Sequence, residues 1–260
     1  MSEQLAGALI GLGGAIFGVL VSGAISLWMQ RQSTTSETAE DFRAVVEKLV
    51  DARMQLFGVM RQYAQDTAGR ETLSYAINAK RQLYKSTAAR MLERAKDELT
   101  ANDYATLGQE YQQDSEFESA LACFKRALEH VGDSVLEHVN ALRSLGWAYL
   151  APSTLHDRAE GERCYRKAAE LLDRGEDDDY NRYQLGLTHE NWGFGLAGRY
   201  PDWHEHVDLA REHYESMSTA NPLRGYALES LDMHLAQQQG AQPVAIPPAR
   251  QPPPLGGIGS

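Results

Sequence analysis

Residues 104–127 read YATLGQEYQQDSEFESALACFKRA, and this stretch decides the fold. Its large apolar residues recur at the spacing of an amphipathic helix. Small residues stand at Gly108 and Ala120, where they would let two helices approach closely, and Tyr104 and Phe124 would fill the layer between them. The stretch therefore predicts two short helices that pack together as one unit.

The spacing of this stretch resembles a tetratricopeptide repeat, a helix–turn–helix unit of about 34 residues. The family's usual proline after the second helix is missing, and Gly132 stands in its place. The resemblance implies a binding scaffold rather than a catalyst, and it names no particular partner. The matching positions are Tyr104, Leu107, Gly108, Tyr111, Phe117, Ala120, Phe124 and Ala127.

Two further copies of the unit are predicted downstream. The phrase Leu-Gly-x-x-Tyr at 107–111 returns at 145–149, with extra residues in the following turn at 151–153. A third, weaker copy is expected to begin at Trp192-Gly193, with an insertion around 200–203. The second helices of these two copies are marked by Gly161, Tyr165, Ala168, Ala210, Tyr214 and Met217.

The end of the repeat region is marked by Asn221-Pro222, which reads as the start of a capping helix because proline suits the first helical turn. The sequence thus predicts an all-α chain in which a single transmembrane helix is followed by an α-solenoid. The predicted domains are an anchor at 1–30, two long helices at 31–100, repeats with a capping helix at 101–240, and a disordered Pro/Gly-rich tail at 241–260.

The N-terminal anchor is predicted from Leu5–Met29, a run of 25 residues without a charge. About 20 apolar residues suffice to cross a bilayer. A cleaved signal peptide is the alternative, but such a peptide has a basic leader and this chain begins Met-Ser-Glu-Gln. Basic residues follow the run at Arg31, Arg43 and Lys48, which favours a bacterial inner-membrane protein with its C-terminal domain in the cytoplasm.

The anchor contains a stripe of small residues of the kind that lets membrane helices pack closely. This stripe predicts self-association, although glycine is also common in membrane helices generally. Its residues are Gly7, Gly11, Gly14, Gly18 and Ser22.

Two long helices are expected between the anchor and the repeats. Thr38 and Asp41 resemble a capping box, and the apolar residues from Phe42 to Tyr63 recur every three or four positions. This helix would pack onto the first repeat, and a parallel dimer stalk is the alternative. The second helix is predicted over Glu71–Leu99.

Composition and motifs indicate no catalytic chemistry, so neither an enzyme nor a cofactor or metal site is predicted. The net charge of −11 argues against nucleic acid as a partner. The cysteines Cys123 and Cys164 are expected to be buried apolar residues. His204 and His206 are two positions apart, which does not supply the i, i+4 pair of a helical zinc site, so we expect them on the surface.

In tetratricopeptide proteins the first helices of successive repeats line a concave groove that binds a protein or peptide, and the resemblance implies the same here. The clamp of the chaperone-binding members is not expected, because Ala105 and Gln109 occupy two of its positions. Arg143 and Trp147 form the best anchor pair, unless Trp147 packs against a neighbouring segment. The implied groove residues are Asn102, Gln109, Gln112, Asn140, Arg143, Trp147, Glu190 and Phe194.

These features together predict a membrane-anchored scaffold that binds a partner protein. One alternative makes the glycine-rich helix an oligomerising membrane effector, with the repeats as its sensor. Another is a secreted protein whose repeats work in the periplasm.

Overall fold

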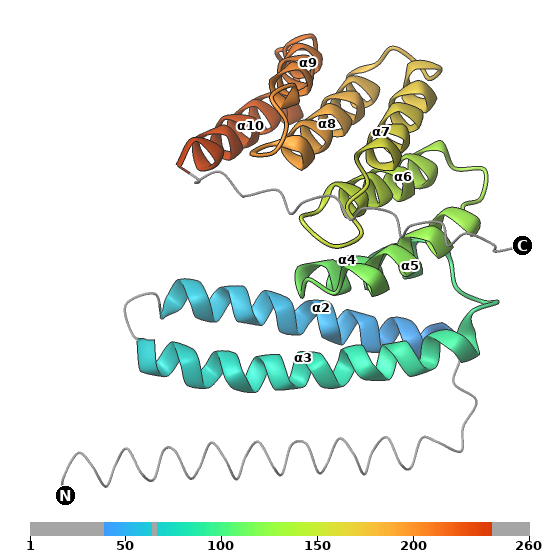
Figure 1. The fold of residues 1–260 in the computed structure, drawn as a ribbon, viewed down its shortest axis with the longest axis vertical. Coiled ribbons are helices and arrows are strands. Elements are labelled where there is room, and N and C mark those ends of the chain that lie inside the picture. Colours follow the sequence, from blue (N-terminus) through green and yellow to red (C-terminus); the bar gives the residue numbers. More distant parts are fainter. Residues whose placement is uncertain (1–38, 64–66, 241–260) are drawn as a thin grey trace, which may run out of the picture. The chain divides into compact units, whose positions relative to one another are not determined.

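The computed structural model describes residues 39–63 and 67–240, and all regular secondary structure in these ranges is helical (Figure 1). The all-α prediction is confirmed for this part of the chain. The structure divides after His130 into two compact units. The first predicted helix pair therefore belongs with the two long helices, and the later pairs form a unit of their own.

Unit 1 consists of two helix pairs (Figure 1). The long helices α2 and α3 pack along each other, and α4 packs against α5 and contacts α2. The predicted apolar stripe of α2 is buried in its first half, at Phe42 and Leu49 for example, whereas Phe57 and Met60 are exposed. The helices are α2 (Ala39–Gln62), α3 (Thr67–Ala95), α4 (Ala101–Gln113) and α5 (Phe117–Glu129).

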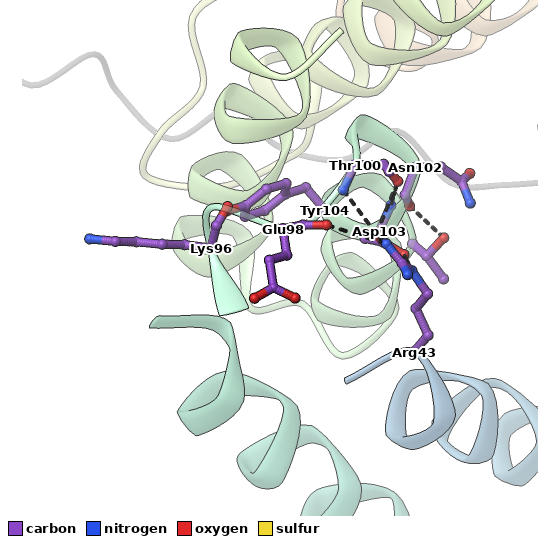
Figure 2. A network of polar contacts seen from close by, with 8 residues as sticks. Arg43, Lys96, Glu98, Thr100, Asn102, Asp103 and Tyr104 are labelled. Carbon is purple, nitrogen blue, oxygen red and sulfur yellow. Dashed lines mark hydrogen bonds and ion pairs between the residues drawn. The ribbon is translucent and has the colours of Figure 1, made fainter. Parts of the chain in front are cut away.

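A polar network fixes the start of α4 beside α2 (Figure 2). Asp103 and Thr100 form a capping box, in which the Asp103 carboxylate accepts from the Thr100 amide at 2.9 Å. The same carboxylate accepts three hydrogen bonds from the Arg43 guanidinium, two from Nε at 3.0 and 3.1 Å and one from Nη2 at 2.8 Å. Burial raises the pKa of Asp103, but the hydrogen bonds from Arg43 and Thr100 outweigh it, so the net pKa is lowered.

The described residues of unit 2, 131–240, form five helices, and among the first four the first and second helices of two pairs alternate. Helix α6 packs on α7 and α8 packs on α9, while α8 also contacts α6, α7 and α10. Asp157 and Asp178 cap the starts of α7 and α8 by accepting from the amide three residues on, and Ser134 does the same for α6. The helices are α6 (Val135–Leu150), α7 (Arg158–Asp173), α8 (Asp179–Leu196), α9 (Trp203–Glu215) and α10 (Pro222–Gly240).

One close contact recurs in three helix pairs: a glycine of the first helix lies against an aromatic ring of the second. A Cβ added at Gly108 would lie 2.5 Å from the Phe124 ring, and one added at Gly146 would lie 2.6 Å from the Tyr165 ring. In the third pair the ring of Tyr214 lies against Gly186 in the same way. The backbones can approach this closely because glycine has no side chain, and the space that a Cβ would need is filled by the ring.

The third contact corrects the predicted start of the third copy. The glycine that meets the second helix's ring is Gly186, whereas Gly193 lies against the carbonyl of Trp203 and the side chain of Val207. The Leu-Gly phrase is therefore at 185–186, seven residues earlier than predicted. The pattern was hidden because His189 stands where the two earlier copies have tyrosine.

The predicted anchor and tail, at 1–30 and 241–260, lie outside the described residues. The small residues proposed for helix packing in the anchor lie there too: Gly7, Gly11, Gly14, Gly18 and Ser22. Among the helices between 39 and 240 that the structure describes, none combines the length and apolar character needed to span a bilayer.

Candidate partner-binding surface

Three residues predicted for the groove form one stripe on α6. Asn140, Arg143 and Trp147 follow one another at intervals of three and four residues, which places them on the same helix face. Asn140 is exposed, and the other two side chains are partly buried. The structure thus brings the predicted residues of the second repeat together.

The charged member of this stripe, Arg143, has only neutral hydrogen-bond partners. Its Nη1 donates to Oε1 of Gln184 on α8 at 3.1 Å, and its Nη2 donates to Oδ1 of Asn140. Among the described residues, no carboxylate lies within ion-pair distance of Arg143, because the ion pairs of unit 2 involve other arginines and His234. Burial lowers the pKa of Arg143, and tyrosine hydroxyls partly offset the effect. The residues that supply these hydroxyls are Tyr165, Tyr214, Tyr183 and Tyr180.

Helix α8 contributes different residues to this surface from those predicted. With Gly186 as the equivalent of Gly146, Tyr180 and Tyr183 take the positions that Asn140 and Arg143 hold on α6. Tyr180 is half exposed and Tyr183 is partly buried. The sequence reading missed both tyrosines because it placed the third copy seven residues too late.

Of the two residues predicted from that later position, Glu190 is buried and Phe194 is partly buried. Glu190 is 5% exposed, and its carboxylate accepts from the Tyr214 hydroxyl at 2.7 Å and lies 2.8 Å from Nδ1 of His234. The Phe194 ring packs with the apolar cluster of α9 and α10 and contacts Trp203. Glu190 is therefore buried, which corrects its prediction as a surface contact, and Phe194 serves mainly to pack the helices together.

The groove residues predicted on α4 lie in unit 1. Asn102 and Gln109 are exposed, and Gln112 is partly buried. They give α4 an uncharged polar face. No arrangement relative to the α6 stripe follows from the structure, because the two units are described separately.

The opposite face of α4 carries an ion network that sequence reasoning missed. Glu110 is fully buried and pairs with Arg53 of α2 at 2.7 Å and with Arg81 of α3 at 3.4 Å. Arg81 also pairs with Asp114 at 2.9 Å, and Lys85 bridges Asp114 to Glu116. The network joins three helices, and each of its buried cations has a carboxylate partner.

The histidines of α8 and α9 stack beside Trp192. The His206 ring lies 3.8 Å from the Trp192 ring, and His189 lies between His206 and His213, with centroid separations of 5.6 and 5.5 Å. His204 is exposed, as predicted, but His206 is partly buried, which corrects the surface prediction for it. Within the described ranges no group of three or more histidine, cysteine or acidic side chains could hold a metal ion.

Acid is expected to destabilise unit 2 through this stack. Burial, together with repulsion from His206 and His213, lowers the pKa of His189 from 6.5 to about 4. The unfolded chain therefore takes up more protons than the folded one below pH 6.5, so the free energy of unfolding falls as the pH drops toward 4. We expect a loss of about 1 kcal/mol between pH 6.5 and 5.5, measured by urea unfolding with tryptophan fluorescence.

His189→Gln should flatten this pH dependence, and the exposed His204→Gln should leave it unchanged. An equal slope in all three proteins would show that the stack is not its source. Burial also lowers the pKa of His206 and that of His213, and nearby carboxylates offset part of each shift: Glu162, Asp202, Glu205, Glu212 and Asp173.

The two predicted insertions pack against each other. Arg199 donates to the carbonyls of Leu150 and Gly195, the latter at 2.7 Å, and its Nη1 lies 2.9 Å from Nδ1 of His156. His156 Nε2 in turn lies 2.8 Å from the Tyr200 hydroxyl. The loop after α6 and the loop after α8 thus form one structure.

Both cysteines are buried and not disulfide-bonded, as predicted. Burial raises the pKa of the Cys123 thiol to about 12 and also raises that of Cys164. A thiol in this state is protonated at neutral pH and is a poor nucleophile.

A scan against protein-family models, a search of curated proteins and a search of solved structures each found no match.

Proposed function

We propose that this chain is a helical-repeat scaffold that binds a partner protein on the face formed by α6 and α8. The observation that carries the proposal is the glycine–aromatic contact shared by three helix pairs. Stacks of equivalent helix pairs leave a row of first helices on one side, and such rows serve as extended binding surfaces. The tetratricopeptide resemblance of residues 104–127 supports the same reading.

The side chains on this face support binding. Arg143, Trp147, Tyr180 and Tyr183 are of the three residue types most enriched among residues that dominate the energy of protein interfaces. They come from the adjoining helices α6 and α8, and Arg143 of α6 donates a hydrogen bond to Gln184 of α8 across the contact between them. A flexible loop would not hold these groups in one arrangement, whereas packed helices do.

The uncharged run at 5–29 suggests where in the cell the proposed scaffold acts. As a retained helix it would hold the bound partner at the bacterial inner membrane, and the glycine stripe would let copies associate. The same run favours a second candidate, an oligomerising membrane effector regulated by the helical units. Replacing Gly11, Gly14 and Gly18 with leucine separates the two, because a scaffold keeps its partner and an effector loses its action on the membrane.

Cross-linked affinity capture of the full chain from its native membrane tests the scaffold. A protein recovered with the wild type should be lost with the double variant Asn140→Ala/Trp147→Ala. It should be retained with Arg166→Ala, which removes an exposed side chain from α7 of the same unit. If the double variant recovers the same proteins in the same amounts, the face formed by α6 and α8 is not the binding surface.

A further inference from the structure

The Arg143 guanidinium has more hydrogen-bonding capacity than the protein uses. An arginine carries five N–H donors. Two of them are engaged, one by Gln184 and one by Asn140. The other three have no acceptor among the residues that the structure describes. The guanidinium therefore still has N–H groups with which it could form two parallel hydrogen bonds to a carboxylate.

Arg143 differs from the buried cations of unit 1 in having no carboxylate partner among the described residues. A partly buried charge without a counter-charge is unfavourable, and the chain shows the usual solution elsewhere. In unit 1 the buried Arg81 and Lys85 are both paired with carboxylates. Arg143 donates to two side-chain amide oxygens and has no carboxylate partner within the described ranges, although an acidic residue at position 140 or 184 would have supplied one.

A second polar group without a partner packs against the same part of α6. Tyr165 is fully buried, and its hydroxyl has no hydrogen-bond partner within the described part of unit 2. The Tyr165 ring lies against Gly146, which is one helical turn from Arg143 on α6. Buried hydroxyls normally have a partner, so a hydroxyl without a partner and a cation without a counter-charge both belong to the same part of α6.

We propose that Arg143 binds the side-chain carboxylate of an aspartate or glutamate in a peptide segment of the partner, an inference that rests on the proposed function. One guanidinium matches one carboxylate in charge and in bidentate geometry. A phosphate carries up to two charges and would be matched by more than one cation. The net charge of −11 further disfavours a polyanionic ligand.

The neighbouring residues indicate that the bound segment continues on both sides of its acidic residue. Asn140 lies one turn before Arg143 on α6, and Trp147 lies one turn after it. An extended segment along this stripe would place its carboxylate at the centre, with a polar contact at one side and an aromatic contact at the other. A chain that ended at Arg143 would leave one of the two neighbours without a contact.

Selection from a library of random 12-residue peptides tests this inference on the full chain in lipid nanodiscs. Peptides selected by the wild type should share an internal aspartate or glutamate. Their affinity should fall at least about tenfold with Arg143→Glu and with the milder Arg143→Gln. The matched control Arg166→Glu, an exposed arginine on α7, should bind them as the wild type does. Thermal unfolding of each variant identifies any that fails to fold.

A repeat of the selection with Arg143→Glu gives the sharper result, because its peptides should carry lysine or arginine in place of the acidic residue. Peptides without acidic enrichment, or with equal affinity for Arg143→Gln, would overturn the carboxylate site while leaving the scaffold in place. Peptides that lose affinity only when their C-terminus is amidated would also overturn the internal-segment proposal. If the wild type selects no peptide at all, the peptide-segment proposal fails, and the affinity capture described above decides separately whether the scaffold function fails with it.

Discussion

Replacing Glu110 with alanine is expected to destabilise unit 1 by about 3–5 kcal/mol, the usual cost of removing one partner from a buried ion pair. The carboxylate is fully buried between Arg53 and Arg81, at 2.7 and 3.4 Å. Its removal leaves Arg53 without this partner and leaves Arg81 with Asp114 alone. Unit 1 has no tryptophan between residues 39 and 130, so hydrogen exchange of the α4 amides is the appropriate measurement.

The matched control for this experiment is Glu118→Ala, which removes an exposed carboxylate from α5 of the same unit. Its cost should stay below about 1 kcal/mol, the size of a helix-dipole contribution at the first turn. The loss of stability in Glu110→Gln should fall between those of Glu110→Ala and Glu118→Ala, because glutamine keeps the shape and some hydrogen bonding but loses the charge. Equal protection of α4 in Glu110→Ala and the wild type would mean that the network does not hold unit 1 together.

The second large effect is expected from a single methyl group at Gly108. Its Cβ would lie 2.5 and 2.7 Å from two atoms of the Phe124 ring, which is fully buried and has no room to retreat. Gly108→Ala should therefore destabilise unit 1 by about 2–3 kcal/mol, as overpacking of a dense core does. Protection of the α4 and α5 amides against exchange should fall accordingly.

The same substitution at Gly58 supplies the control, because a Cβ there would meet nothing within 4 Å. Gly58 lies on the exposed side of α2 in the same unit, so Gly58→Ala should stabilise the helix by about 0.5–1 kcal/mol. The two variants differ in local packing and not in chemistry. Destabilisation by both, or by neither, would contradict the close contact between α4 and α5.

Much of the helix packing could be predicted from the sequence where local signals agreed. At 104–127 the small and aromatic residues are close along the chain, so their spacing predicted that two helices approach closely at Gly108 and that Phe124 fills the layer between them. The prediction for the third pair failed because its contacting residues, Gly186 and Tyr214, are 28 positions apart and His189 stands where tyrosine was expected. An insertion between two helices lengthens this separation without changing the packing.

The candidate site was only partly predictable for a related reason. Helix periodicity places Asn140, Arg143 and Trp147 on one face from the sequence alone. It does not show what Arg143 meets on the next helix, because Gln184 is 41 residues away. The partners of Glu110 are likewise remote, so its burial could not be read from a polar stretch that suits a solvated helix equally well. Long-range pairing of charges depends on the folded structure and leaves no local pattern.

The joined loops after α6 and α8 constrain how this chain can be altered. Arg199 and Arg158 each connect one loop region to the other, through the carbonyl of Leu150 and the carboxylate of Asp202. Shortening only one of the two loops to the length of the turn between α4 and α5 would leave the charged groups of the other loop without their hydrogen-bond partners. A designer who trims this protein, or grafts its helices elsewhere, should remove or transplant both loops as a single part.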